Sequence, residues 1–93
     1  MKYSIVITSS YKNSYKKIIK RGKNLEKLKN VIKILANGKE LDEKYKDHQL
    51  SSSKKYINCR ECHIEPNWLL VYKINKNELI LLLIETGSHS DLF

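Results

Sequence analysis

Proline and glycine are scarce in this sequence of 93 residues, which contains one proline and three glycines. Disordered chains are rich in these residues and poor in aliphatic clusters, whereas the aliphatic residues here gather in runs. The composition therefore excludes a disordered protein. At this length we expect a single folded domain over residues 1–93, which buries roughly two-thirds of the surface that the unfolded chain exposes.

Long apolar runs are also absent. The longest run, Leu79 to Ile84, is far below the roughly 18 residues that a membrane span needs. The apolar stretch of Ile5, Val6 and Ile7 is too short for a secretory signal peptide. We therefore expect a cytoplasmic protein, in which the two cysteines are reduced thiols.

Acidic residues are nearly missing from the first part of the chain. Residues 1–39 hold eleven Lys and Arg against Glu26 alone, a net charge of +10, whereas residues 40–93 hold seven against nine acids, a net charge of −2. This asymmetry favours a polyanionic partner, such as nucleic acid or an acidic protein. The excess of lysine, sixteen against two arginines, equally suits solvated helix faces, because phosphate recognition usually favours Arg. Charge alone leaves both interpretations open.

Hydrophobic periodicity predicts a short strand and two helices in the first forty residues. The strand is expected over 3–8, and the polar residues 8–10 offer N-caps for a helix that runs to about Arg21. A second helix is expected between a cap at Asn24 and a stop at Gly38. The short connection between them predicts an antiparallel helical hairpin.

Periodicity disappears over residues 39–55, which we expect to be a long loop. Three strands are predicted after it, at about 55–63, 68–74 and 79–85, joined by turns. The predicted class is α+β with the order βααβββ, in which the hairpin packs on one face of a mostly antiparallel four-stranded sheet. The strand over 79–85 is apolar on both faces, so the face without helices must be covered by the 39–55 loop or by a partner chain.

The string Cys59-Arg60-Glu61-Cys62-His63 matches the C-x-x-C-H spacing of haem attachment. The chain offers no methionine except Met1 as a second axial ligand, which argues against haem. On a strand, positions i and i+3 point to opposite faces, which argues against a disulfide or a two-cysteine zinc site. We expect neither a metal nor a cofactor.

The three histidines, His48, His63 and His89, all fall near the ends of predicted elements. Cleavage of RNA without a metal needs a base for the 2′-OH and an acid for the 5′ leaving oxygen, and histidine suits both roles near neutral pH. Trp68 and Phe93 are candidates to stack on bases. The candidate cations for the phosphate are Lys46, Lys54, Lys55 and Arg60.

Three blocks of sequence carry a resemblance to a known family. They are Tyr45-Lys46-Asp47-His48-Gln49-Leu50, Arg60-Glu61-Cys62-His63-Ile64-Glu65-Pro66-Asn67-Trp68 and Thr86-Gly87-Ser88-His89-Ser90-Asp91-Leu92-Phe93. In order and spacing they resemble the signature blocks of YafQ-type toxins, in the RelE/ParE superfamily of bacterial type II toxin–antitoxin systems. The resemblance implies a ribosome-dependent endonuclease that cleaves translated mRNA in the A site by 2′-OH attack, without a metal. It also implies a cognate antitoxin, expected to be a small DNA-binding protein with an acidic tail that forms a hetero-oligomer with the toxin.

Carried over position by position, His48, His63 and His89 match the catalytic histidines of the family, and Trp68 and Phe93 match its active-site aromatics. Position 67 is Asp in the family motif and Asn67 here. An amide cannot accept a proton usefully, so Asn67 is expected to bind a base or to hold a histidine.

Three other functions remain open. A gyrase-directed toxin of the ParE kind would share the fold but needs no histidine set. A relative that only binds its antitoxin would fit the change at position 67. A general binder of single-stranded nucleic acid would show a steep salt dependence. For the basic hairpin we expect docking on ribosomal RNA, unless the antitoxin covers that surface or the sheet.

Overall fold

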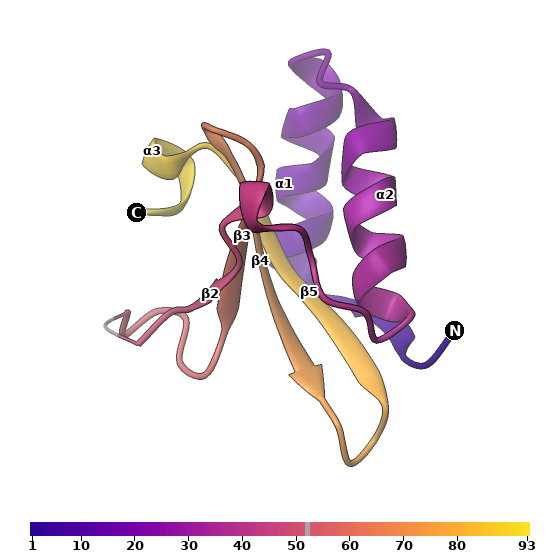
Figure 1. The fold of residues 1–93 in the computed structure, drawn as a ribbon. Coiled ribbons are helices and arrows are strands. Elements are labelled where there is room, and N and C mark those ends of the chain that lie inside the picture. The colour runs from indigo at the N-terminus through magenta and orange to yellow at the C-terminus, as the bar shows by residue number, and fades with distance from the viewer. Residues whose placement is uncertain (52) are drawn as a thin grey trace.

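The computed structural model describes residues 1–51 and 53–93. In chain order its elements are β1 (Ser4–Ile7), α1 (Ser9–Lys20), α2 (Leu25–Ala36), the short 3-10 helix η1 (Glu43–Tyr45), β2 (His48–Gln49), β3 (Arg60–Glu65), β4 (Trp68–Asn75), β5 (Ile80–Gly87) and α3 (His89–Leu92). Figure 1 shows α1 and α2 side by side against one face of the sheet, with α3 on the other side of it. The predicted α+β class is confirmed.

The two long helices begin and end where their caps predict. Thr8 caps α1 by accepting a hydrogen bond from the Tyr11 amide, and Asn24 caps α2 by accepting one from the Glu26 amide. Beyond α2, Gly38 has a positive φ of 74°, a left-handed conformation that glycine adopts without strain. Local chemistry therefore accounts for the positions at which the two helices begin and end.

The sheet has five strands, in the order β1-β5-β4-β3-β2, so the prediction of four was wrong. β1 pairs with β5 in parallel, and the other pairs are antiparallel. The additional strand, β2, lies inside the predicted loop and pairs His48 with Glu61. β3 begins at Arg60, five residues later than expected, after a turn in which Asn58 has a positive φ of 59°. A two-residue strand carries no periodicity, which is why the sequence did not predict it.

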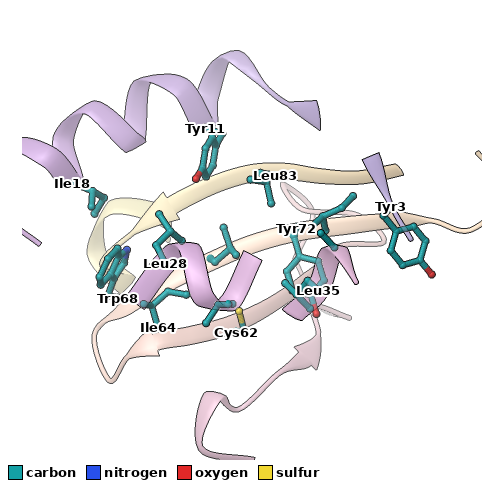
Figure 2. Close-up of a cluster of buried hydrophobic side chains, with 14 residues drawn as sticks. Tyr3, Tyr11, Ile18, Leu28, Leu35, Cys62, Ile64, Trp68, Tyr72 and Leu83 are labelled. Carbon is teal, nitrogen blue, oxygen red and sulfur yellow. The ribbon is translucent and has the colours of Figure 1, made fainter. Parts of the chain in front are cut away.

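The helix-covered face of the sheet holds the main hydrophobic core (Figure 2). Ile18 and Leu28 from the hairpin meet Cys62, Trp68 and Tyr72 from the sheet, and all five are nearly inaccessible to solvent. Helices pack here because the apolar stripe of each falls on one side, at helical spacing.

The opposite face of the sheet, which we call the open face, carries a smaller apolar cluster: Tyr56, Cys59, Leu69, Val71 and Leu92. Leu50, from the predicted loop, packs against it, and Leu92 brings in α3, which was not predicted. The covering chain expected for this face is therefore supplied from within the protein. Cys59 and Cys62 are free thiols in different clusters, as the spacing predicted. Among the described residues no helix is long and apolar enough to cross a membrane.

Candidate active site

Two of the predicted histidines meet on the open face of the sheet. His48 in β2 pairs with Glu61 in β3, and His63 lies two residues further along β3. Residues opposite each other in a ladder, and residues i and i+2 on one strand, share a face. The rings of His48 and His63 consequently lie 6.5 Å apart between centroids. Sheet register, rather than sequence distance, brings them together.

Each of these two rings has one nitrogen occupied by a backbone carbonyl. His48 Nδ1 lies 2.7 Å from the carbonyl oxygen of Lys46, and His63 Nδ1 lies 3.2 Å from that of Pro66. Because a carbonyl can only accept, each Nδ1 carries the proton and donates it. Each Nε2 is then left to take up and release a proton, which is the arrangement that general acid–base chemistry requires.

Both free nitrogens face Glu61. Its Oε1 lies 3.5 Å from His63 Nε2 and 3.7 Å from His48 Nε2. The residue is 5 % exposed, and its Oε2 has no hydrogen-bond partner among the described residues. A buried carboxylate with an unpaired oxygen is uncommon, and a catalytic role is one of its physical explanations. It can hold a protonated imidazole in place.

Sequence reasoning missed Glu61, although a signal was present. An acid two positions before a histidine on a predicted strand must share the face of that histidine. The nearby cysteines drew attention to the haem and zinc interpretations instead.

The third histidine, His89, lies on α3 beside the exposed ring of Phe93. Their ring centroids are 5.1 Å apart, and Phe93 is 52 % exposed, so it is available to stack on a base. α3 begins with a capping box in which Ser88 and Asp91 bond each other's backbone amides. Arg21 on the hairpin pairs with Asp91 through both guanidinium nitrogens and thereby lowers the pKa of that carboxyl well below its usual range. The helix is held by contacts at both ends of its one turn.

Asn67 contributes one of these contacts. Its Oδ1 accepts a hydrogen bond of 3.2 Å from the backbone amide of His89. The amide oxygen therefore ties the β3–β4 turn to the first residue of α3. Of the two roles expected for Asn67, holding a histidine is the one for which the structure shows a contact.

Trp68 lies on the helix-covered face, contrary to its expected role. It is 1 % exposed, and its Nε1 donates a 3.0 Å hydrogen bond to Thr86 Oγ1. The prediction that Trp68 stacks on RNA bases was wrong, because the ring is enclosed in the core (Figure 2).

Arg60 also points away from the histidines. It pairs across the ladder with Tyr72, on the helix-covered face, and its guanidinium lies 3.2 Å from Asp47. The hydrogen bonds to Asp47 and Tyr72 raise its pKa, against an opposing effect of burial. A role for Arg60 in binding the scissile phosphate is not compatible with this orientation.

The three lysines expected to bind phosphate are all exposed. The carbonyl of Lys46 orients His48. Lys55 lies 3.8 Å from Glu85, a second carboxylate on the open face. Lys54 directly precedes Lys55 in the sequence.

Glu85 also accepts a 2.8 Å hydrogen bond from Tyr56, and burial together with that bond raises the pKa of the tyrosine.

The open face thus combines two imidazoles with free Nε2 atoms, a shared buried carboxylate, a third imidazole and an exposed aromatic ring. Such a set can move protons to and from a substrate that Phe93 holds by stacking. Among the described residues no group of three or more His, Cys, Asp or Glu side chains is arranged to hold a metal ion.

The chain is similar to known proteins over nearly its whole length. A family described as "Bacterial toxin of type II toxin-antitoxin system, YafQ" matches residues 3–93. The mRNA interferase toxin YafQ of Escherichia coli strain K12 is 37 % identical over 90 residues, which are 96 % of this chain and 94 % of that protein.

Two solved structures are similar over nearly the whole chain. A metal-bound toxin from Helicobacter pylori is 40 % identical, with a TM-score of 0.90, and the match covers 98 % of this chain and 99 % of that one. YafQ in the E. coli DinJ–YafQ complex is 35 % identical, with a TM-score of 0.86 and coverage of 98 % of both chains.

Proposed function

Because this chain belongs to the YafQ family of toxins of bacterial type II toxin–antitoxin systems, we propose that it is a ribosome-dependent endoribonuclease. It cleaves translated mRNA in the A site by attack of the 2′-OH on the adjacent phosphorus, and so inhibits translation. The related E. coli toxins are named mRNA interferases, which supports the endoribonuclease activity.

The observation that carries this proposal is the pair of imidazoles that face Glu61. One neutral Nε2 can take the proton of the 2′-OH, and one protonated imidazole can donate to the 5′ oxygen as it leaves. His89, next to Phe93, is the third candidate for these two roles and for stabilising the charge on the phosphorus. These groups supply proton transfer without a metal.

The change from Asp to Asn at position 67 does not remove the contact that this position makes here. An amide oxygen can accept the His89 amide hydrogen bond in the place of a carboxylate oxygen, although without the added strength of a charged acceptor. We therefore assign Asn67 a positioning role and leave the proton transfers to the histidines.

A cognate antitoxin is the proposed protein partner, because YafQ of E. coli was solved in complex with DinJ. The ribosome and its mRNA are the proposed polyanionic partners, and the net charge of +10 over residues 1–39 suits docking of the hairpin on ribosomal RNA. The two proposed partners, the antitoxin and the ribosome, place the protein in the cytoplasm.

The test is a single-turnover cleavage assay with antitoxin-free protein on programmed ribosomes. We expect cleavage in the A site, and a loss of roughly 10² or more in rate for His63→Ala and for His89→Ala, because each removes acid–base catalysis. Asn13→Ala, on the exposed side of α1, is the matched control and should cleave like the wild type.

Two results of this assay would contradict the proposal. Intact mRNA on programmed ribosomes would exclude the nuclease, and growth arrest with intact mRNA and a DNA-damage response would select the gyrase-directed alternative. A strict requirement for an added divalent metal, after treatment with a chelator, would overturn the metal-independent mechanism. Copper belongs among the metals tested, because a mutant toxin from H. pylori was solved with copper bound.

A further inference from the structure

A cavity of about 450 Å³ lies between α2, η1 and the turn that joins β3 to β4. Its walls include Lys27 and Asn30 from α2, Lys44 and Tyr45 from η1, Lys46 directly after it, and His63 from β3. We call it the lysine cavity. Its volume is within the range of sites that bind small ligands, and it is large enough for one nucleotide.

His63 belongs both to the lysine cavity and to the proposed active site. Its Nε2 faces Glu61 on the open face, while the residue also lines the cavity. A molecule that occupies the lysine cavity therefore lies beside one of the imidazoles expected to transfer protons. The cavity is positioned as an extension of the active site rather than as a separate one.

The charge of the lysine cavity favours an anion. Lys27 is neutralised by Glu65, at 2.9 Å, and Glu65 is the one acid in the wall. Lys44 and Lys46 lie within 4.0 Å of no carboxylate in residues 1–51 and 53–93. Both ammonium groups are exposed and so remain available to a phosphate.

Lys46 connects the cavity to the catalytic histidines through its backbone. It has a positive φ of 48°, in the left-handed region that residues with a β-carbon seldom adopt. In this conformation its carbonyl accepts the hydrogen bond from His48 while its side chain lines the cavity. Strain of this kind persists where the surrounding structure requires it, and it is concentrated at functional sites.

Tyr45 positions the Lys44 side chain. Tyr45 is half-buried against the main core, and the Lys44 ammonium lies 5.2 Å from the centroid of its ring. Packing of the ring against the core and the attraction between the ammonium and the ring together hold the Lys44 charge at the wall of the cavity.

We propose that the lysine cavity is a subsite for one RNA nucleotide next to the cleaved bond. Lys44 and Lys46 bind its phosphate, and Tyr45 holds the Lys44 ammonium in the wall. The assignment rests on the proposed nuclease function and adds to it the path of the RNA, which runs from Phe93 on one side of the histidines to η1 on the other. Free nucleotides share the same chemistry, so the test must separate them from RNA.

The test is equilibrium binding of a fluorescent RNA hexamer in which every 2′-OH is methylated, so that it cannot be cleaved. The double variant Lys44→Ala/Lys46→Ala should bind it at least fivefold more weakly. It should also flatten the dependence of log K on log salt concentration by about 0.7, because the two lysines together neutralise one phosphate of a single strand. Asn30→Asp, which adds a carboxylate to the wall and removes no lysine, should weaken binding too.

Lys39→Ala/Lys76→Ala is the matched control. It removes the same charge from two exposed lysines outside the lysine cavity. It should leave both the affinity and the salt slope within error of the wild type. Adenosine monophosphate and inorganic phosphate are the probes for a free-ligand site, and both should bind at least tenfold more weakly than the hexamer.

The subsite and the nuclease can fail separately. If the ribosome assay shows cleavage but Lys44→Ala/Lys46→Ala and Asn30→Asp leave KM and hexamer binding unchanged, the subsite is wrong and the nuclease stands. If the variants weaken hexamer binding but no cleavage occurs on ribosomes, the cavity binds RNA and the nuclease is wrong. Equal affinity for adenosine monophosphate and for the hexamer would replace the RNA subsite with a free-nucleotide site.

Discussion

The two faces of the sheet differ in what their buried residues do. The helix-covered face buries fourteen residues in the main core, none of them charged. The open face buries a smaller apolar cluster and, within the same sheet, the carboxylate of Glu61 with an unpaired oxygen. Apolar burial on the helix-covered face stabilises the fold, whereas a buried charge with an unpaired oxygen costs free energy. The comparison therefore predicts that substitutions on the first face lower stability and that substitutions around Glu61 lower activity.

Trp68 gives the strongest test of this contrast. Trp68→Ala should lower the free energy of unfolding by about 3–5 kcal/mol, the usual effect of removing a buried aromatic ring from a core. Phe93→Ala removes a ring that is 52 % exposed and should change stability by less than about 1 kcal/mol, while it reduces RNA cleavage. Urea unfolding followed by circular dichroism measures both. Similar losses of stability for the two variants would contradict the division between the faces.

Glu61→Gln should move stability and activity in opposite directions. The amide keeps the shape of the side chain and removes a buried charge, so unfolding should require the same free energy or up to about 1 kcal/mol more. Cleavage should fall roughly tenfold or more, because an amide no longer holds a protonated imidazole at Nε2. The two measurements are urea unfolding and single-turnover cleavage. A Gln variant that is both less stable and fully active would assign Glu61 a structural role.

Asp91 connects the two faces, because it ties α3 to Arg21 on the hairpin. Its pKa is lowered in the folded state, so its contribution to stability is present above the unfolded value near 3.8 and is lost as the pH falls through the lower folded value. Asp91→Asn should therefore be about 1 kcal/mol less stable at pH 7, from the loss of the ion pair and the cap.

The pH dependence supplies the control for this variant. The difference between Asp91→Asn and the wild type should be constant from pH 7 to 5 and should shrink below about pH 4. Glu65, whose pKa is lowered by hydrogen bonds to Lys27 and Lys23, is common to both proteins and cancels from the comparison. If the difference in stability between Asp91→Asn and the wild type grew as the pH falls, it would contradict the predicted direction of the pH dependence.

The smallest effect is expected from the cysteines, one on each side of the sheet. Burial raises the pKa of Cys59 and of Cys62, and both thiols are nearly inaccessible to solvent. A disulfide reagent should label neither thiol in the folded protein at pH 7 and both after denaturation. Rapid labelling of Cys59 alone would show that the cluster on the open face is looser than the main core.

Most of the architecture followed from local sequence patterns. The helical hairpin was predicted almost to the residue, since Thr8 and Asn24 are N-caps and Gly38 adopts the left-handed conformation at the end of α2. β4 and β5 were predicted from their apolar runs. What the patterns missed was short or held in place by tertiary contacts: β2 has two residues, and α3 has one turn, held by Arg21, Tyr56 and Asn67.

The candidate site was predicted in part. The three histidines and Phe93 were identified from the motif blocks, and the structure places all of them on or beside the open face. Glu61 was missed, and Trp68 and Arg60 were given roles in RNA binding that their positions on the helix-covered face do not support. Strand alternation relates Glu61 and Arg60 to His63, but the face on which Trp68 lies relative to the histidines depends on the pairing of β3 with β4, which the sequence does not display.

The amino-acid order was sufficient to specify the hairpin, the class of the fold, the charge asymmetry and the residue types of an acid–base site. The assignment of those residues to faces came from strand register. The antiparallel register that pairs Cys62 with Leu70 and His63 with Leu69 puts Leu69 on the face of the histidines and its neighbour Trp68 in the core. A slip of one residue would exchange the two, because side chains alternate along a strand. That choice depends on packing summed over the whole sheet, which no local pattern contains.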